Sequence, residues 1–367
     1  INLAITQNII NKCRYFLCPL NSAFNSSTHS LSASRNLKVK LLTGLKMAET
    51  KVSAALNCID LSDPDIQKSA ASLKQACMDS GFFYVINHGI SKEFMDEVFA
   101  QSKKFFELPF DEKMKLWVER NRGYKQPLKN QFFDQETNQQ AHGEAYSLVG
   151  PETEDDLDPE KPLCGPNVWP SADVLPGWKE TMLRYQQEAL NLGRKIGRII
   201  ALALDLDVDF FDKPEILGNA MPYVSFNHYG VQDADPSKEY ILGTPAHSDP
   251  SLITLLATDE VPGLQICRNI HANPRVWENC FYCQYWRYVG EDEQLCFQVH
   301  NAQSPVSPGD HQSPFDIQVT TAMIECFPTC KSEEKPPKYP PIKCKDLFNI
   351  IFKNVADGKT ARDITEA

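Results

Sequence analysis

The sequence of 367 residues predicts an α+β protein, in which a mainly helical N-terminal part precedes a β-rich part. Two observations predict this class. Apolar residues recur at three- and four-residue steps over 178–206, which is typical of an amphipathic helix. From Met221 onward, apolar and aromatic residues instead favour strands. An apolar content of 42% and a charged content of 23% are ordinary for a globular protein.

The N-terminal part alternates short strands and helices. Residues 58–61 are predicted to form a strand, and a helix is predicted over 63–77, because Asp and Pro at its start favour helix initiation. The apolar run 81–86 predicts a buried strand, which ends in a turn containing His88. We expect His88 to be structural because it lies in that turn. A second helix is predicted over 92–106 from its helical spacing of apolar residues.

Two longer stretches follow. Residues 122–170 combine several prolines with an acidic run at 152–158. We interpret them as an irregular surface excursion that helps to wall a pocket, and the acidic run as a solvated loop. The helix over 178–206 has the clearest amphipathic pattern in the chain. Its apolar stripe is assigned to core packing and to no chemistry.

The first 46 residues differ from the rest. They contain no Asp or Glu but several Ser, Asn, Lys and Arg residues, and the first methionine of the chain is Met47. We interpret this segment as non-native upstream sequence that has been read through. The alternative is an organelle transit peptide, which has a similar composition.

Composition argues against several classes of function. The net charge of −11 disfavours a nucleic-acid-binding protein, because binding to phosphates needs a basic face. No apolar stretch is long enough to span a bilayer, so no membrane attachment is expected. The 12 cysteines are scattered through a chain too long to need a disulfide framework. They indicate reduced core residues in a cytoplasmic protein.

The most informative motif is His247-Ser248-Asp249. Side chains alternate between the two faces of a strand, so His247 and Asp249 are expected to project side by side. An imidazole and a carboxylate, joined by one distant His, form the 2-His-1-carboxylate triad, which leaves iron(II) with open positions for a co-substrate and O2. The motif is followed by an apolar run at 251–256 and a turn at 261–264, as expected between strands.

In order along the chain, several stretches resemble the plant-type Fe(II)/2-oxoglutarate-dependent dioxygenases. This superfamily includes flavonol synthases, gibberellin oxidases and isopenicillin N synthase. The resemblance covers Leu56 to about Asn279 and resumes at Ile324. The stretches that carry it are 80–89 (SGFFYVINHG), 165–170 (GPNVWP), 227–229 (NHY), 247–249 (HSD) and 262–265 (PGLQ).

The resemblance implies a double-stranded β-helix, or jelly-roll, core. It also implies that His247 and Asp249 bind Fe(II), and that Tyr229 and Asn227 hold 2-oxoglutarate. His228 is expected to face the other side of its strand from Tyr229 and to be structural. The family oxidises small organic molecules by hydroxylation or desaturation, with O2 and 2-oxoglutarate as co-substrates and ascorbate as reductant. We expect a plant secondary metabolite as substrate, and a monomer.

The pattern breaks in the C-terminal part. The family has a second iron-binding His about fifty to sixty residues after the first, followed by an Arg-x-Ser strand whose Arg pairs with 2-oxoglutarate. Neither motif is present, and no arginine lies between Arg287 and Arg362. His300 is at a permissible distance and is a weak candidate for the third ligand. His311 is another, although a solvated His is the favoured interpretation of both.

A shifted reading frame explains the break. Residues 280–305 can be assigned codons that, read one base later, spell AFIVNIGDMLERMSNCVFKSTMHRVL. That peptide resembles the family segment with the missing ligand, and its His falls on the codons of Ala302 and Gln303. We therefore hypothesise a frame error or a frameshifted allele over 280–323, with the frame restored near Ile324. The replaced segment is expected to deprive the jelly roll of core strands and to impair the enzyme.

Two alternatives remain. The chain could be a non-catalytic homologue that keeps an organic pocket. Less favoured is a zinc module, because Cys280, Cys283, Cys296 and His300 have zinc-ligand spacing. The expected division of the chain is 1–46 non-native or targeting segment, 55–170 dioxygenase N-terminal region, 171–218 core helix and connection, 219–330 jelly-roll domain (280–323 aberrant), and 331–367 C-terminal tail.

Overall fold

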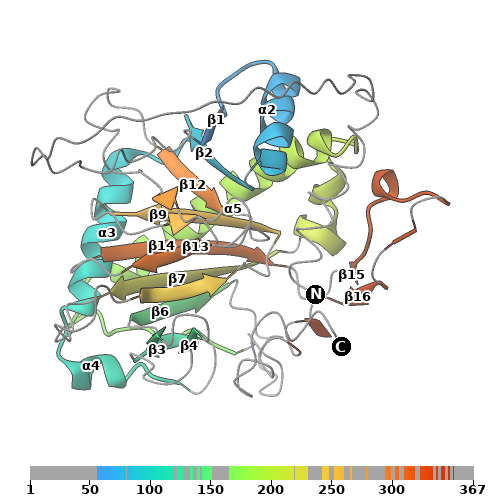
Figure 1. The fold of residues 1–367 in the computed structure, drawn as a ribbon. Helices are drawn as coiled ribbons and strands as arrows, with labels where there is room; N and C mark the ends of the chain where they lie inside the picture. Colours follow the sequence, from blue (N-terminus) through green and yellow to red (C-terminus); the bar gives the residue numbers. More distant parts are fainter. Residues whose placement is uncertain are drawn as a thin grey trace, which may run out of the picture.

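The molecule is built around two β-sheets with helices on one side (Figure 1). The computed structural model describes residues 56–79, 81–118, 122–126, 133–134, 139–140, 143–150, 165–218, 220–229, 242–247, 252–259, 265–266, 278–279, 294–298, 302–305, 310–318, 323–333, 336–337, 340–343, 346–347 and 350. The expected segment 1–46 and the acidic run at 152–158 lie outside these residues.

The N-terminal elements confirm the predicted order of strands and helices. Side-chain caps start two of the helices. The Asp65 carboxylate accepts the backbone N–H of Gln67 at 3.0 Å, and Ser91 Oγ accepts that of Phe94 at 3.3 Å, which satisfies N–H groups that have no partner within the helix. The elements are β1 (Asn57–Asp60), α2 (Ile66–Asp79), β2 (Phe82–Ile86), α3 (Lys92–Phe106) and α4 (Phe110–Met114).

The long helix α5 spans Trp178–Ala203. It confirms the predicted helix, but it ends three residues before the predicted end at 206. The reason lies in Asp205, which has a φ of 58° in the left-handed region, where a right-handed helix cannot continue. Short helical turns follow at Phe210–Asp212 and Pro214–Gly218. Among the helices that the structure describes, none has the length and apolar content needed to cross a bilayer.

The large sheet has eight strands in the order β1-β2-β12-β9-β14-β7-β6-β3. Its remaining strands are β3 (Gly123–Lys125), β6 (Glu144–Val149), β7 (Met221–Tyr229), β9 (Ile253–Thr258), β12 (Gln294–Gln298) and β14 (Asp310–Gln318). The small sheet has the order β11-β10-β13-β8. Its strands are β8 (Leu242–His247), β10 (Gln265–Ile266), β11 (Glu278–Asn279) and β13 (Ala302–Pro305).

Two further pairs of short strands lie outside the two main sheets. Strands β4 (Phe133–Asp134) and β5 (Gln139–Gln140) pair with each other, as do β15 (Met323–Ile324) and β16 (Ile342–Lys343). A short helical turn at Pro328–Cys330 lies between the last two strands in the sequence.

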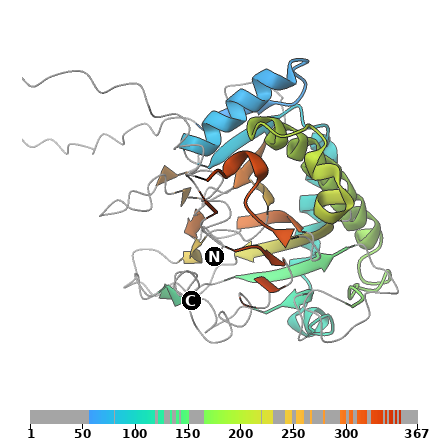
Figure 2. The ribbon, with the colours of Figure 1, turned by 90° about the vertical axis from the view of Figure 1, so that its right-hand side faces the viewer.

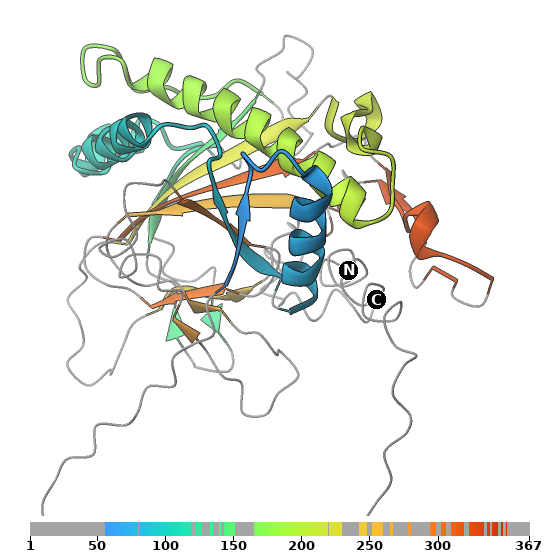
Figure 3. The same ribbon diagram turned by 90° about the horizontal axis from the view of Figure 1, so that it is seen from above.

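From β7 to β14 the chain passes back and forth between the two main sheets. Strands β7, β9, β12 and β14 join the large sheet, while β8, β10, β11 and β13 join the small sheet. Seen from above, the small sheet lies across from the large sheet, on the side away from α5 (Figure 3). The two sheets therefore present one face each to a common interior.

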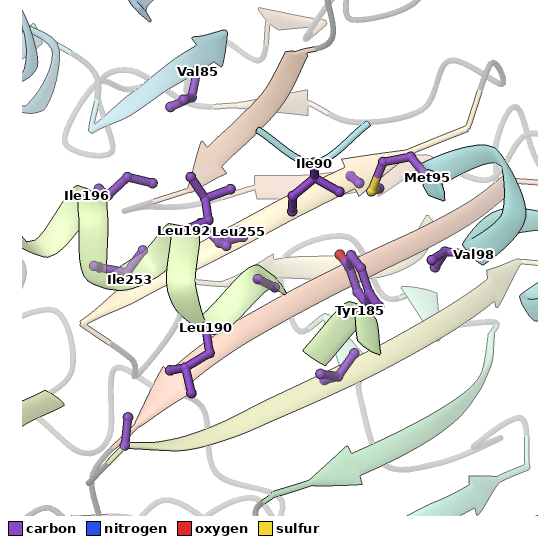
Figure 4. Packing of buried hydrophobic residues seen from close by; sticks show 14 of the residues in the cluster. Val85, Ile90, Met95, Val98, Tyr185, Leu190, Leu192, Ile196, Ile253 and Leu255 are labelled. Carbon is purple, nitrogen blue, oxygen red and sulfur yellow. The ribbon is translucent and has the colours of Figure 1, made fainter. Parts of the chain in front are cut away.

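The outer face of the large sheet is covered by helices. α5 runs along this face, and Leu192 and Ile196 of the helix point toward Ile253 and Leu255 of β9 (Figure 4). α2 packs beside α5, as the side view shows (Figure 2). Burial of this apolar stripe stabilises the fold by about 25 cal/mol for each Å² removed from water. The structure thus confirms core packing as the role of the 178–206 stripe.

Trp178 at the start of α5 ties the helix to two strands and to α3. Its side chain is fully buried, and its ring centroid lies 4.9 Å from that of Tyr146 on β6 and 6.3 Å from that of Phe226 on β7. The indole N–H donates to the carbonyl of Gln101 on α3 at 3.0 Å. An indole buried in this way needs a hydrogen-bond partner, and here it has one.

The interpretation of 122–170 as an irregular excursion is wrong for two segments. Strands β3 and β6 belong to the large sheet, and the side chains of Tyr146 and Leu148 are fully buried there. The polar residues Glu144 and Ser147 interrupt the apolar pattern of β6, so this pattern does not predict a strand. Both of them are buried because they have hydrogen-bond partners within the fold.

The expectation that 280–323 deprives the sheets of core strands is also wrong. This segment forms β12, β13 and β14, and β12 pairs with both β2 and β9. Ladder hydrogen bonds join backbone groups, so unsuitable side chains do not by themselves prevent strand pairing. The segment therefore contributes strands to both main sheets.

Candidate functional site

Strand β7 carries the described part of the candidate site. Phe226 packs toward α5, where its ring centroid is 6.1 Å from that of Tyr185. Because successive residues of a strand point to opposite faces, Asn227 and Tyr229 lie on the other face, which is turned toward the small sheet (Figure 3). The two residues expected to hold 2-oxoglutarate are thus on the interior face of the large sheet.

A hydrogen-bonded row of side chains continues along this interior face. Lys125 Nζ donates to the hydroxyl of Tyr223 at 3.1 Å, and that hydroxyl is 2.9 Å from Ser147 Oγ. Ser147 Oγ is 3.4 Å from Ser225 Oγ, which donates to Asn227 Oδ1 at 3.0 Å. We call these five residues the polar row. It links β3, β6 and β7 and leads along β7 toward Tyr229.

Tyr229 is held closely by the backbone that enters β6. Its side chain is 5% exposed. A Cβ added to Gly143 would lie 2.8 Å from the Cδ1 atom of the Tyr229 ring. Real contacts are not this short, so only a glycine at position 143 leaves the ring where it is. The close approach of Gly143 therefore fixes the position of Tyr229 in the interior.

The opposite face of the same strands has a buried charged cluster, made of Lys113, Tyr124, Glu144 and His228. The Glu144 carboxylate is 2.7 Å from Lys113 Nζ and 2.9 Å from His228 Nδ1, and it accepts the Tyr124 hydroxyl at 2.5 Å. Burial raises the pKa of Glu144, but hydrogen bonds from His228, Lys113 and Tyr124 outweigh burial. The net result is a lowered pKa. Burial and the bond to Glu144 raise the pKa of Tyr124.

His228 and His88 both have structural positions. His228 lies on the helix side of β7, where its ring centroid is 5.2 Å from that of Phe106, so it faces away from Tyr229 as expected. His88 is 6% exposed, and its Nδ1 accepts the backbone N–H of Ile90 at 3.1 Å. Burial, with a smaller contribution from the charge of Lys195, lowers the pKa of His88 to about 4. A neutral His with this bond is a turn-stabilising group.

The expected metal-binding motif begins at the end of β8. His247 is the last residue of that strand, and it pairs directly with Ala302 of the antiparallel strand β13. Asp249, the second expected ligand, and His300, the weak third candidate, lie outside the described residues. His311 is in β14, where it pairs with His228 of β7.

These residues fit an iron triad only in part. Within the described part of the chain, no three His, Cys, Asp or Glu side chains gather as a metal site. The sequence supplies one imidazole and one carboxylate at 247–249, and the residue paired with His247 is Ala302, which has no donor atom. A facial triad needs a second imidazole. Among the described residues that pair with β8, none supplies it.

Comparison with known proteins agrees with this architecture. Residues 56–172 match the family model described as the non-haem dioxygenase in morphine synthesis N-terminal region. The chain is 51% identical over 321 residues to kihadalactone A synthase LFS of Citrus sinensis, a match that covers 84% of this chain and 94% of that protein. It is 47% identical over 314 residues to azadirone synthase LFS of Melia azedarach, covering 82% and 93%.

Solved structures show the same fold. A 2OG-Fe(II) oxygenase family protein from Caulobacter crescentus aligns with a TM-score of 0.66 at 18% identity, covering 83% of this chain and 100% of that one. JOX2 in complex with 2OG, Fe and JA aligns with a TM-score of 0.62 at 22% identity, covering 81% and 85%. The two facing sheets with helices on one side are thus a fold shared with these solved structures.

The chain belongs to the Fe(II)/2-oxoglutarate-dependent dioxygenase superfamily. Members of this family are oxidoreductases that use Fe(II) and 2-oxoglutarate to oxidise small metabolites.

The sequence did not reveal most of the polar row. Asn227 was expected in the site, but Lys125, Ser147, Tyr223 and Ser225 were not. A signal was present within β7, where polar side chains alternate with apolar ones. No such signal pointed to Lys125 and Ser147, because their strands are short or carry mixed residues.

Proposed function

We propose that this protein carries the site of an oxygenase that hydroxylates or desaturates a small plant metabolite. His247 and Asp249 are two of its iron ligands, and Asn227 and Tyr229 hold 2-oxoglutarate. The observation that carries the proposal is the position of Asn227 and Tyr229 on the interior face of the large sheet, across from the small sheet in which β8 ends at His247.

The remaining polar row belongs to the substrate side of the same interior. Lys125, Tyr223, Ser147 and Ser225 offer hydrogen bonds along one wall of this interior. They suit a substrate with oxygen acceptors on an otherwise apolar skeleton. The names of the two plant relatives suggest a compound related to kihadalactone A or azadirone.

The passage of the chain between two sheets supports assignment of the interior to a double-stranded β-helix, or jelly roll. We propose 219–330 as this domain, with 55–170 as the dioxygenase N-terminal region, 171–218 as the core helix and its connection, and 331–367 as a tail. Segment 1–46 is proposed to be upstream or targeting sequence.

We further propose that this exact chain is impaired. The second iron-binding His and the arginine that would pair with 2-oxoglutarate are missing from 280–323. Loss of one ligand weakens the metal site, and loss of the arginine leaves a dicarboxylate without a bidentate charge partner. The second candidate is a non-catalytic homologue that keeps the pocket, favoured by the survival of both sheets in spite of these losses. A zinc module at 280–300 is the least favoured alternative.

Several properties outside the site are proposed from composition. The net charge of −11 supports the absence of nucleic-acid partners. Among the described residues, Cys58, Cys77, Cys326 and Cys330 form no disulfide, which supports a reducing, cytoplasmic location. A monomer without membrane attachment and a requirement for ascorbate are proposed on the family resemblance.

A succinate-release assay with iron(II) and ascorbate tests the function. Two proteins are compared, this chain and a version in which 280–305 is replaced by the shifted-frame peptide, each with metabolites related to kihadalactone A and azadirone. We expect succinate and oxidised product from the second protein only, and only at saturating 2-oxoglutarate, because the replacement restores the histidine but not the arginine. Equal turnover by this chain would overturn the proposed impairment. A folded second protein that consumes no 2-oxoglutarate would overturn the enzyme assignment.

Metal analysis of the purified chain tests the zinc alternative. Stoichiometric zinc would favour the zinc module.

A further inference from the structure

The pairing of β13 with β8 places one residue directly opposite His247. Ala302 and His247 are Cα partners in this antiparallel pair. Directly opposed residues of an antiparallel pair share one face of the sheet, with Cβ atoms about 4.5–5.5 Å apart. Metal–nitrogen bonds of about 2 Å allow two histidines at such positions to reach a single ion. Position 302 therefore meets the geometric requirement for a second imidazole.

We infer that position 302 is the place of the third iron ligand, and that the alanine there leaves the site without this ligand. This inference rests on the proposed function of His247 and Asp249. Among the described residues of 280–323, the register places 302 opposite His247, since β13 is the neighbour of β8 in the small sheet. An alanine there supplies no lone pair, so the ion keeps only the two donors of 247–249.

The frameshift hypothesised from the sequence is consistent with the same position. The shifted-frame peptide contains one histidine, and its codon is drawn from those of Ala302 and Gln303. An alanine codon GCA followed by a glutamine codon CAG reads CAC, which encodes histidine, when the frame moves by one base. The hypothesised frameshift thus places its histidine at the position that the register of β13 against β8 selects.

Gln303 is a matched control within the same strand. Strand β10 pairs with β13 in a regular register, with Ile266 opposite Ala302 and Gln265 opposite Gln303. Positions 302 and 303 therefore lie on opposite faces of the small sheet. A histidine placed at 303 adds the same chemical group one residue away, but on the face that does not carry His247.

The test measures metal binding by the full-length chain rather than turnover. Unaltered chain, Ala302→His and Gln303→His are titrated with Co(II) without oxygen. Affinity is followed by calorimetry and by the visible absorption of bound Co(II). We expect Ala302→His to bind one Co(II) per chain, with an affinity gain above the roughly 10–100-fold that supporting groups around metal ligands provide. Gln303→His should match the unaltered chain, and His247→Ala should abolish the gain in the Ala302→His background.

Three other results of the Co(II) titrations would each overturn a particular claim about the site. If folded Ala302→His binds no better than Gln303→His, position 302 is not the ligand position. If the unaltered chain already binds Co(II) tightly and loses it with His300→Ala, the third ligand is His300 and the inference fails, while the proposed iron site stands. If the gain at 302 persists after His247→Ala, the site does not involve His247, and the proposed function fails instead.

A second experiment covers the case in which Ala302→His does not fold. The full chain is prepared with the shifted-frame peptide at 280–305, and again with the single histidine of that peptide changed to alanine. We expect tight Co(II) binding by the first protein and loss of binding by the second. Equal Co(II) affinity of these two proteins would overturn the assignment of position 302.

Discussion

The ammonium of Lys113 lies 2.7 Å from the carboxylate of Glu144, and the two side chains are only 9% and 10% exposed. Removing one partner of a buried pair leaves the other charge without compensation, which costs roughly 3–5 kcal/mol. We expect Glu144→Gln to lower the free energy of unfolding by an amount of this order, measured by urea denaturation.

The matched control is Glu188→Gln on α5, where Glu188 pairs with Arg184 at 2.8 Å on the surface of the helix. Surface pairs contribute about 0–1 kcal/mol, so this control should be nearly neutral. The lowered pKa of Glu144 means that its contribution is present above its usual pKa and disappears as the pH falls through its folded pKa. The difference between Glu144→Gln and the unaltered chain should shrink in acid. A constant difference would contradict the charged cluster.

The buried His88 predicts a second dependence of stability on pH. Its pKa falls from 6.5 to about 4 in the folded state, so the unfolded state binds more protons between these values. The free energy of unfolding should therefore decrease as the pH falls from 6.5 toward 4, by up to about 3 kcal/mol from this one group. His88→Asn keeps an acceptor for Ile90 N–H but does not titrate. The variant should lose this part of the pH dependence, and an unchanged slope would exclude His88 as its source.

Tyr229 and Tyr223 allow a paired test of the 2-oxoglutarate site. A hydrogen bond to a charged group contributes about 1.5–3 kcal/mol, so Tyr229→Phe should weaken 2-oxoglutarate binding roughly 10–100-fold. The measurement is calorimetry with Mn(II) in the Ala302→His background. Tyr223→Phe makes the same chemical change six residues away, about 20 Å along the strand. It should leave 2-oxoglutarate affinity unaltered, and equal losses in both variants would argue against a local role for Tyr229.

Gly143→Ala tests the position of the Tyr229 ring without removing any polar atom. The new methyl group would meet the ring at 2.8 Å, so the ring or the backbone must move. Overpacking of this kind costs about 1–3 kcal/mol of stability. We also expect weaker 2-oxoglutarate binding, and Tyr229→Leu should relieve the stability cost by removing the ring. A neutral effect of Gly143→Ala on both stability and binding would show that the ring has room to shift.

Most of the N-terminal half could be predicted from the sequence, because its elements are local. The helical spacing of apolar residues and the capping residues identify α2, α3 and α5, without knowledge of the elements that pack against them. Strand β6 could not be predicted in this way. The burial of Glu144 depends on Lys113, a residue 31 positions earlier, and no local pattern carries such information.

The candidate site, too, was predictable only where the pattern is local to one strand. Alternation along β7 placed Asn227 and Tyr229 together and His228 opposite them, and the structure shows this arrangement on the strand. The roles of His247 and Asp249 remain predictions. Spacing alone left His300 as the weak candidate for a third ligand, since spacing does not say which strands pair. The frameshift hypothesis put its histidine on the codons of Ala302 and Gln303, and the register of β13 against β8 places Ala302 opposite His247.

Strand β2 has a consequence for shortened forms of this protein. It covers β12, which would otherwise form an edge of the sheet, and β6 covers β7 in the same way. A splice product or proteolytic fragment that begins at Trp178 would retain every strand from β7 to β14 but leave two bare edges. Exposed edges of this kind template pairing between molecules. Such a fragment should self-associate rather than persist as a small free-standing barrel.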